Sequence, residues 1–303
     1  MKKILLPVLF VIIILLLPLI FKEKGNRFVV GPELNETMYT EVSFINKYDS
    51  VRLSGMLFTP KSIKSFPIAV IIQGSGTSSK NNSWYLSIAK HLQVNGIGVL
   101  LPDKRGSEKS EGNWKGANLE TLATDTESAI NFIRNESKLN YSEIGIIGMS
   151  QGGWIAPIVA SKEQNLSYLI NMSGATTSTD EQLLYEEYNN IAPYTYNVIA
   201  RLISPITTNN LKKRESIAPL MGFDPMPYWK KTSIPVFIAY GENDTNCPID
   251  KSIERLKNED LNHFIWKIYP KGGHGILDAQ TNEVNIDFLE DMTEFIFEKI
   301  IDN

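Results

Sequence analysis

Residues 144–157 read IGIIGMSQGGWIAP, and the expected fold is inferred from this stretch and the pattern on either side of it. A short apolar strand ends at Gly148, and a helix-forming sequence begins near Trp154. Between them, Gly-x-Ser-x-Gly places Ser150 on a tight strand-to-helix turn, where only glycine lets the neighbouring backbones pass closely. Because a helix N-terminus stabilises developing negative charge, Ser150 is a candidate nucleophile. A glycine-rich turn that serves packing alone is the alternative interpretation.

Strands and helices alternate on both sides of this turn. The patterns predict strands over 38–45, 53–59, 68–73, 98–102, 144–148, 166–173, 235–241 and 264–270. They predict helices over 83–95, 118–135, 151–162, 249–257 and 282–301. The first two strands are expected to pair antiparallel. The rest of the alternation predicts an α/β fold, with a mostly parallel sheet of about eight strands and helices on both faces.

One long stretch interrupts the alternation. Residues 175–232 are rich in Tyr, Asn, Glu and Pro, suggest short helices, and are too long for a plain connection. We therefore expect a helical cap inserted over one end of the sheet. The expected domain organisation is a core formed by 28–174 and 233–303, a cap at 175–232, and a hydrophobic N-terminal segment at 1–27.

A serine nucleophile needs a base, and the sequence offers three histidines. His274 lies in Gly-Gly-His-Gly just after the last expected strand, where a loop can reach the carboxyl edge of the sheet. By contrast, His91 falls within an expected helix, and His263 precedes a strand at its opposite end. His274 is therefore the candidate base.

The histidine in turn needs an orienting acid. Asp244 lies at the tip of the loop that follows the expected strand 235–241, with Glu242 and Asp250 as competitors. Asp250 has the position of a helix N-terminal residue, where a carboxylate stabilises the helix itself. Asp244 is the preferred candidate.

The order Ser150, Asp244, His274, each after an expected strand, resembles the α/β-hydrolase superfamily. The resemblance covers about 38–303, and it is nearest to membrane-anchored or extracytoplasmic bacterial esterase-like members with a dienelactone-hydrolase-like or acyl-peptidase-like core. It implies a catalytic triad and an oxyanion hole formed by the backbone N–H groups of Ser75 and Gln151. The chain departs from the family at Gln73, where these hydrolases commonly have His.

A second motif extends the resemblance. Many bacterial members carry Asp-x-Arg-Gly-x-Gly-x-Ser after the fourth strand, and Asp103, Arg105, Gly106 and Ser110 match it. Glu108 replaces the second glycine of the motif. We expect Asp103 and Arg105 to act as structural hydrogen-bonding residues and not as substrate ligands.

Composition limits the other possibilities. The 303 residues carry a formal charge of −4, and residues 1–27 contribute +4, so the remainder carries −8 without a basic cluster. Nucleic-acid binding is therefore not expected. A single cysteine, Cys247, allows neither an intramolecular disulfide nor a thiolate zinc site. We expect no metal and no cofactor.

The N-terminal segment has its own signal. Residues 4–21 are uncharged and almost wholly aliphatic or Phe, and as a helix they would span about 27 Å, close to the thickness of the membrane's hydrocarbon core. With no cleavage motif after them, they predict a single-pass signal-anchor in the cell membrane. Lys2 and Lys3 favour a cytoplasmic N-terminus and an extracytoplasmic catalytic domain. A cleaved peptide with a secreted product, or a buried helix, is the alternative.

These observations predict a serine hydrolase that cleaves a carboxylic ester or thioester of a small-molecule acyl substrate through an acyl-enzyme on Ser150. A peptidase or amidase of the same fold is the first alternative. A membrane-tethered binding module that has lost its chemistry is the alternative from another class, because fold does not determine function. Oligomeric state is not addressed by any of these patterns.

Overall fold

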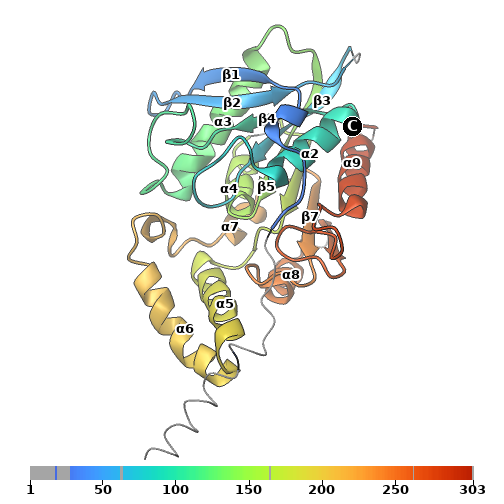
Figure 1. The fold of residues 1–303 in the computed structure, drawn as a ribbon. Helices are drawn as coiled ribbons and strands as arrows, with labels where there is room; N and C mark the ends of the chain where they lie inside the picture. Colours follow the sequence, from blue (N-terminus) through green and yellow to red (C-terminus); the bar gives the residue numbers. More distant parts are fainter. Residues whose placement is uncertain (1–17, 19–27, 62–63, 164, 262, 302–303) are drawn as a thin grey trace, which may run out of the picture.

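The computed structural model describes residues 18, 28–61, 64–163, 165–261 and 263–301 (Figure 1). At its centre is an eight-stranded sheet with the strand order β1-β2-β4-β3-β5-β6-β7-β8. The strands are β1 (Thr40–Ile45), β2 (Arg52–Phe58), β3 (Phe66–Ile72), β4 (Gly98–Pro102), β5 (Tyr141–Met149), β6 (Tyr168–Met172), β7 (Val236–Gly241) and β8 (Ile265–Tyr269). Pairing is antiparallel from β1 to β2 and from β2 to β4, and parallel elsewhere. The predicted fold class and the antiparallel opening pair are confirmed.

Helices cover both faces of the sheet. On one face lie α2 (Ser83–Val94) and α9 (Ile286–Ile301), and on the other lie α3 (Leu119–Asn135), α4 (Gly152–Ala160), α7 (Met226–Trp229) and α8 (Ile249–Asn258). Neighbouring residues of β5 show the two cores, since Ile146 packs in the α3–α4 layer and Ile147 in the α2–α9 layer. Strands buried on both faces are almost continuously apolar, as parallel sheets require.

The last helix begins later than the sequence pattern predicts. It starts at Ile286, not at 282, because the residues before it are used as extended chain. Val284 forms an isolated antiparallel bridge with Leu277, and Glu283 forms a parallel bridge with Val30. Val284 is buried as expected, but it belongs to this connection and not to the helix.

The stretch that interrupts the alternation forms two substantial helices. α5 (Thr179–Ile191) and α6 (Asn197–Leu211) are longer than the short helices expected, and the 3₁₀ turns η2 (Ala192–Tyr194) and η3 (Ala218–Leu220) follow them. Figure 1 shows α5 and α6 extending away from the sheet as a pair. A further 3₁₀ turn, η1 (Leu34–Glu36), precedes β1.

The signal-anchor predicted over 4–21 lies outside the described residues, apart from position 18. Among the helices that the structure describes, none combines the length and the apolar character needed to span a bilayer.

The parallel strands determine where a site can form. β3, β5, β7 and β8 run in the same direction, so the loops after them meet at one edge of the sheet. In open α/β sheets, ligands bind at this carboxyl edge.

Candidate active site

Ser150 lies on a strained turn between β5 and α4. Its φ of +53° is in the left-handed region, which a non-glycine residue rarely adopts. The turn depends on two close approaches: a Cβ on Gly148 would lie 2.5 Å from the Gly152 carbonyl oxygen, and one on Gly152 would lie 2.1 Å from that of Ile72. The Ser150 N–H donates to the Met172 carbonyl at 2.9 Å. Together these contacts hold the hydroxyl at the carboxyl edge of the sheet.

The three residues singled out in sequence form one chain of hydrogen bonds. The His274 ring lies with Nε2 2.8 Å from Ser150 Oγ, and with Nδ1 2.9 Å and 3.1 Å from the two carboxylate oxygens of Asp244. They come from the loops after β5, β7 and β8. Trp84 at the start of α2 flanks the His274 ring at a centroid distance of 5.9 Å, and its indole N–H donates to the Gly275 carbonyl.

The environment of Asp244 separates it from the competing acids. Its side chain is fully buried, and Oδ1 also accepts the backbone N–H groups of Asn246 at 2.7 Å and Cys247 at 2.9 Å. Glu242 is exposed and accepts the backbone N–H of Lys271, while Asp250 is exposed in the first turn of α8. Neither competitor has a described contact with His274. Only Asp244 is oriented by fixed donors toward the imidazole.

The two backbone groups expected at an oxyanion hole are available. Within the described residues, the N–H groups of Ser75 and Gln151 have no hydrogen-bond acceptor. The loop that carries Ser75 is held by its neighbours, since the Gly74 N–H donates to the Tyr85 hydroxyl at 2.8 Å. Gln73, at the position where relatives commonly have His, donates from Nε2 to the Pro102 carbonyl at 2.7 Å and so ties this loop to the end of β4.

Sequence reasoning missed a lysine at this edge. Lys104 donates from Nζ to the Gly74 carbonyl and, at 3.2 Å, to Gln151 Oε1, so it contacts both segments that carry the free N–H groups. The ammonium also lies 5.9 Å from the centre of the Trp114 ring. Burial lowers the pKa of Lys104 to about 8. The sequence signal that could have identified Lys104 is its position just after β4, between Asp103 and Arg105.

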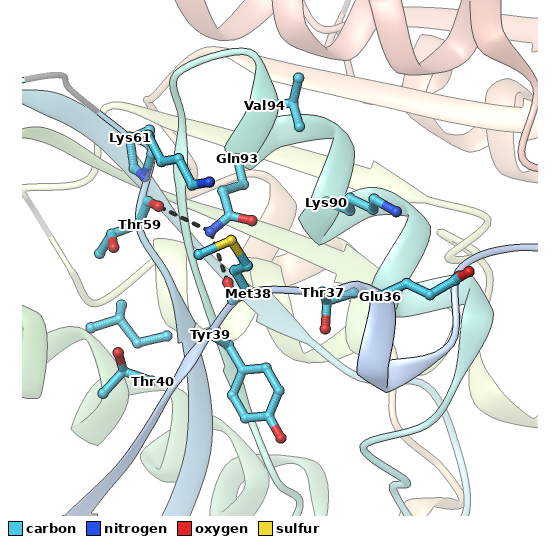
Figure 2. Close-up of a pocket in the computed structure, with 12 residues that line it drawn as sticks. Glu36, Thr37, Met38, Tyr39, Thr40, Thr59, Lys61, Lys90, Gln93 and Val94 are labelled. Atoms are coloured by element: carbon cyan, nitrogen blue, oxygen red, sulfur yellow. Dashed lines mark hydrogen bonds between the residues drawn. The ribbon is translucent and has the colours of Figure 1, made fainter.

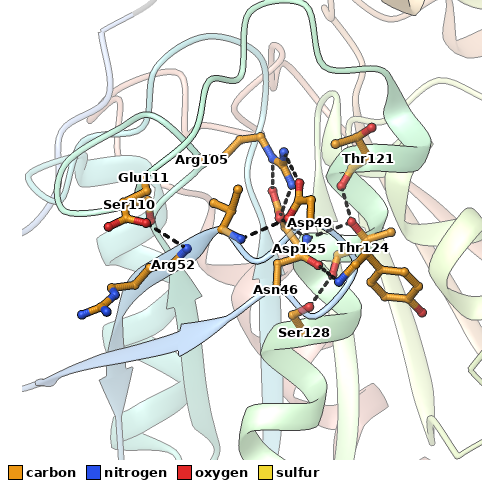
Figure 3. A network of polar contacts seen from close by, with 12 residues as sticks. Asn46, Asp49, Arg52, Arg105, Ser110, Glu111, Thr121, Thr124, Asp125 and Ser128 are labelled. Carbon is orange, nitrogen blue, oxygen red and sulfur yellow. Dashed lines mark hydrogen bonds and ion pairs between the residues drawn. The ribbon is translucent and has the colours of Figure 1, made fainter.

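The second sequence motif builds the scaffold beside this edge, as expected. Buried Asp103 accepts the Ser54 hydroxyl at 2.6 Å, and burial raises its pKa. Figure 3 shows Arg105 in a fork to Asp125, with Nε and Nη2 at 2.8 and 2.7 Å from its oxygens, and a third bond of 2.8 Å to Asp49. These groups contact one another and none of the three triad residues.

Glu108 explains how the motif tolerates the loss of its second glycine. Its φ of +50° is in the left-handed region, the conformation that glycine adopts without cost. The side chain accepts the backbone N–H of Lys80 at 3.0 Å, which anchors the strained turn. The backbone of the motif is thus kept although the residue differs.

The remaining candidates lie elsewhere or are enclosed. Cys247 is buried, which raises the pKa of its thiol, and the described polar contact of the thiol sulfur is Ser252 Oγ at 3.9 Å. His91 packs on Thr293, and His263 packs edge-on against Phe264. Within the described residues, no group of three or more His, Cys, Asp or Glu side chains could hold a metal ion.

Two cavities differ in their relation to the triad. A cavity of about 450 Å³ lies beside His274 and is lined also by Val29, Trp84 and Asn246. A larger one of about 690 Å³ lies at the other end of α2, where Figure 2 shows Gln93 donating to the carbonyls of Met38 and Thr59. The larger cavity contains none of the residues that sequence reasoning selected, so its size does not make it the candidate site.

The sheet order, the serine on its strand-to-helix turn and the loops after β7 and β8 define an α/β-hydrolase. Residues 126–278, half of the chain, match the family described as the C-terminal domain of BAAT and acyl-CoA thioester hydrolases. The chain belongs to this family. Hydrolysis of an ester or thioester is the activity class that this membership supports.

Similar proteins agree on the fold. A protein of Escherichia coli K12 described as uncharacterized protein YfhR is 35% identical over 107 residues, which are 35% of this chain and 36% of that protein. The match thus spans about a third of that relative's length. The α/β-hydrolase GrgF from Penicillium sp. sh18 aligns with a TM-score of 0.65 and 16% identity, over 87% of this chain and 99% of GrgF. The Pyrococcus furiosus esterase Pf2001 aligns with a TM-score of 0.63 and 16% identity, over 91% of this chain and all of that one.

A third solved structure was determined with a bound ligand. It is Est1E from Butyrivibrio proteoclasticus with ferulic acid, and it aligns with a TM-score of 0.59 and 19% identity. The alignment covers 88% of this chain and all of Est1E. At these identities, the three structures establish the fold of this chain.

Proposed function

We propose that this protein is a serine hydrolase that cleaves a carboxylic ester or thioester through an acyl-enzyme on Ser150. The observation that carries the proposal is the hydrogen-bond chain from Ser150 through His274 to Asp244. Family membership supports hydrolysis in general. The geometry supports the serine mechanism in particular, because nucleophile, base and orienting acid are each within hydrogen-bond distance of the next.

In the acylation step, Ser150 Oγ attacks the acyl carbonyl carbon while His274 Nε2 accepts the hydroxyl proton. The carbonyl oxygen becomes an oxyanion, which the N–H groups of Ser75 and Gln151 stabilise. When the carbon–oxygen or carbon–sulfur bond to the leaving group breaks, His274 returns the proton to that group. Asp244 keeps Nδ1 protonated and stabilises the imidazolium that forms between these two events.

Deacylation repeats the sequence with water. His274 takes a proton from the water as its oxygen attacks the acyl carbon, and Ser150 leaves with that proton. The products are a carboxylic acid and the alcohol or thiol released earlier. No external oxidant, reductant or metal is required by this balance.

Lys104 acts in this proposal as a positioning residue. The carbonyl of Gly74 and the N–H of Ser75 belong to one trans peptide plane, so they point in opposite directions. By holding the Gly74 carbonyl from behind, the Lys104 ammonium aims the Ser75 N–H toward the oxyanion. Its positive charge also polarises that peptide, which strengthens the N–H as a donor.

The inserted helices are proposed to wall the acyl site. The Tyr185 hydroxyl on α5 donates to the Asp244 carbonyl at 3.0 Å, and Glu186 accepts the side-chain amide of Asn246 at 2.9 Å. These contacts place α5 directly over the loop that carries the acid. Shortening the 175–232 insertion should therefore change the ranking of acyl-chain lengths.

We also propose that residues 4–21 anchor the chain in the cell membrane with the catalytic domain outside. Support comes from the sequence alone: an uncharged apolar run of membrane-spanning length with Lys2 and Lys3 ahead of it. Extraction of the native protein with alkaline carbonate tests the proposal, because an anchored chain stays in the membrane fraction. Recovery of a chain whose N-terminus begins after residue 21 would indicate cleavage instead.

Labelling by a fluorophosphonate tests the serine mechanism. The intact protein should form a covalent adduct on Ser150 that mass spectrometry locates, and Ser150→Ala and His274→Ala should each abolish labelling. Turnover should then be compared across acyl esters, acyl-CoA thioesters and a peptide amide. Faster turnover of the amide would favour the peptidase alternative, and a folded chain without labelling or turnover would favour the silent binding module.

A further inference from the structure

Helix α6 is inverted with respect to an ordinary surface helix. The face turned inward carries Ala200, Ser204 and Thr208, four residues apart and all buried. The face turned outward carries Val198, Leu202 and Ile206, also four residues apart, with exposed fractions of 69, 69 and 63%. Amphipathic helices of globular proteins bury the apolar stripe and expose the polar one. In α6 a stripe of small residues, two of them hydroxyl-bearing, is buried, and the large aliphatic stripe faces out.

Further exposed apolar residues lie on the same insertion. Ile203 on α6, Tyr194 on η2 and Leu184 on α5 are exposed as well. Figure 1 shows α5 and α6 extending from the body of the protein. Exposed apolar surfaces mark sites of interaction with a protein or a membrane.

Charge around the aliphatic stripe favours an anionic surface. Arg201 lies within α6, and Lys213 and Arg214 follow its C-terminal end, all of them exposed. Helix α6 itself contains no acidic residue, whereas Glu215 follows Arg214 and the neighbouring α5 carries Asp180, Glu181, Glu186 and Glu187. An apolar stripe flanked by basic side chains matches the interface of a bilayer with anionic headgroups.

The first described residues of the chain lie beside the site that the insertion adjoins. Val30 donates its N–H to the Asn282 carbonyl at 2.9 Å, and Val29 lines the cavity beside His274. From residue 21 to residue 28 the chain can extend at most about 25 Å. If a bilayer holds residues 4–21, its surface therefore lies within about 25 Å of residue 28, and Val29 next to it lines the cavity beside the acid loop that α5 contacts.

We propose that the outer face of α6, formed by Val198, Leu202 and Ile206, is a membrane-contacting surface that docks the catalytic domain on the lipid interface. The inversion of the helix supplies the apolar contact, and the basic residues supply the attraction to headgroups. A second copy of this chain is the other occupant that an apolar stripe can take, and the test distinguishes the two.

The test places an environment-sensitive fluorophore on the full-length chain in vesicles of phosphatidylcholine and phosphatidylglycerol. The label goes on Leu202→Cys, with Lys138→Cys as the matched control on the opposite edge of the sheet. Cys247 is buried and does not compete for the label. We expect blue-shifted emission at position 202 that spin-labelled lipid quenches, and neither effect at position 138. Equal quenching at the two positions, or none at 202, overturns the proposal.

A blue shift at position 202 that increases with protein concentration and is not quenched by spin-labelled lipid also overturns the membrane proposal, in favour of self-association.

A second experiment uses the double variant Leu202→Glu with Ile206→Glu, with Val94→Glu as the control for an exposed apolar residue elsewhere. Hydrolysis of a vesicle-resident ester should fall about tenfold in the double variant alone. This hydrolysis experiment rests on the proposed function. In the double variant, turnover of a water-soluble short-chain ester should stay unchanged. If the double variant loses hydrolysis of both the vesicle-resident and the soluble ester, the catalytic site itself is damaged. The fluorescence experiment tests membrane contact without requiring catalysis.

Discussion

Two carboxylates with basic partners, the partly buried Asp125 and the fully buried Asp244, differ in where their hydrogen bonds lead. Asp125 is satisfied by the fork of Arg105 and by Asn46, and Arg105 also donates from Nη1 to Asp49. Asp244 is satisfied by two backbone N–H groups and His274, whose other nitrogen continues to a half-buried serine hydroxyl. The first cluster is a closed structural network, while the second leaves a reactive group at its end. A buried acid indicates chemistry only when its hydrogen bonds lead to such a group.

The largest effect is expected at the open cluster. Asp244→Asn should keep the fold, because the amide oxygen can still accept the backbone N–H groups of Asn246 and Cys247. The amide no longer holds the imidazole in the tautomer that accepts the serine proton, so kcat should fall about 10⁴-fold. Steady-state turnover of a soluble ester, with circular dichroism as the check on folding, measures both outcomes.

Glu242→Gln is the matched control for that change, since Glu242 contacts the Lys271 N–H and not His274. It should leave kcat nearly unchanged. If Glu242→Gln lowers kcat strongly while Asp244→Asn leaves it nearly unchanged, the orienting acid has been misassigned.

An intermediate effect is expected at Lys104, between the two clusters. Lys104→Met removes the donor to the Gly74 carbonyl and should lower kcat by about 10- to 100-fold, less than the loss of a whole oxyanion donor and with KM little changed. Lys104→Arg keeps the charge and should recover part of the rate. If kcat is unaffected while KM rises, Lys104 binds substrate instead of positioning the loop.

The pH dependence sharpens this test. Burial lowers the pKa of Lys104 to about 8, and the positioning role requires the protonated ammonium. Wild-type kcat should therefore decline as pH rises through about 8, and this alkaline decline should be absent in Lys104→Met. On the acid side, protonation of His274 removes the base, so both proteins should lose activity there. A structural role for Lys104 alone predicts the same alkaline profile in both.

The smallest effect on turnover is expected at the closed cluster, where the cost falls on stability. Asp125→Ala leaves the buried Arg105 guanidinium without its bidentate partner, so the free energy of unfolding should fall by about 3 kcal/mol. For the folded protein, kcat should stay within about threefold, because no described contact joins the two clusters. Urea unfolding gives the first quantity and turnover well below the transition gives the second.

Asp49→Ala is the control for that change. The Asp49 side chain is 37% exposed against 13% for Asp125, so its ion pair with Arg105 should contribute less than about 1 kcal/mol. Should Asp125→Ala abolish turnover in a folded protein, the closed cluster would have a part in the chemistry after all.

The sequence alone predicted the sheet and its helices because both follow local patterns. Hydrophobic periodicity located every one of the eight strands to within a few residues, since the central strands are apolar runs and β1 alternates apolar with polar residues. It misplaced the start of α9, because the bridges of Val284 to Leu277 and of Glu283 to Val30 join segments that local periodicity does not connect. Likewise, the composition of 175–232 predicted a helical insertion but not the length of α5 and α6.

The sequence by itself determined the strained turn at Ser150, since the glycines at 148 and 152 are required by backbone approaches within that turn and to the adjoining strand. It also determined the candidates, because residues placed after parallel strands reach the same edge. Only the tertiary structure decided that Asp244, not Glu242, faces His274, and that Lys104 reaches the Gly74 carbonyl 30 residues away in sequence. It alone revealed that α6 is inverted. These three features depend on the direction in which a side chain or a helix face points after distant strands have paired. Local sequence patterns do not encode that direction.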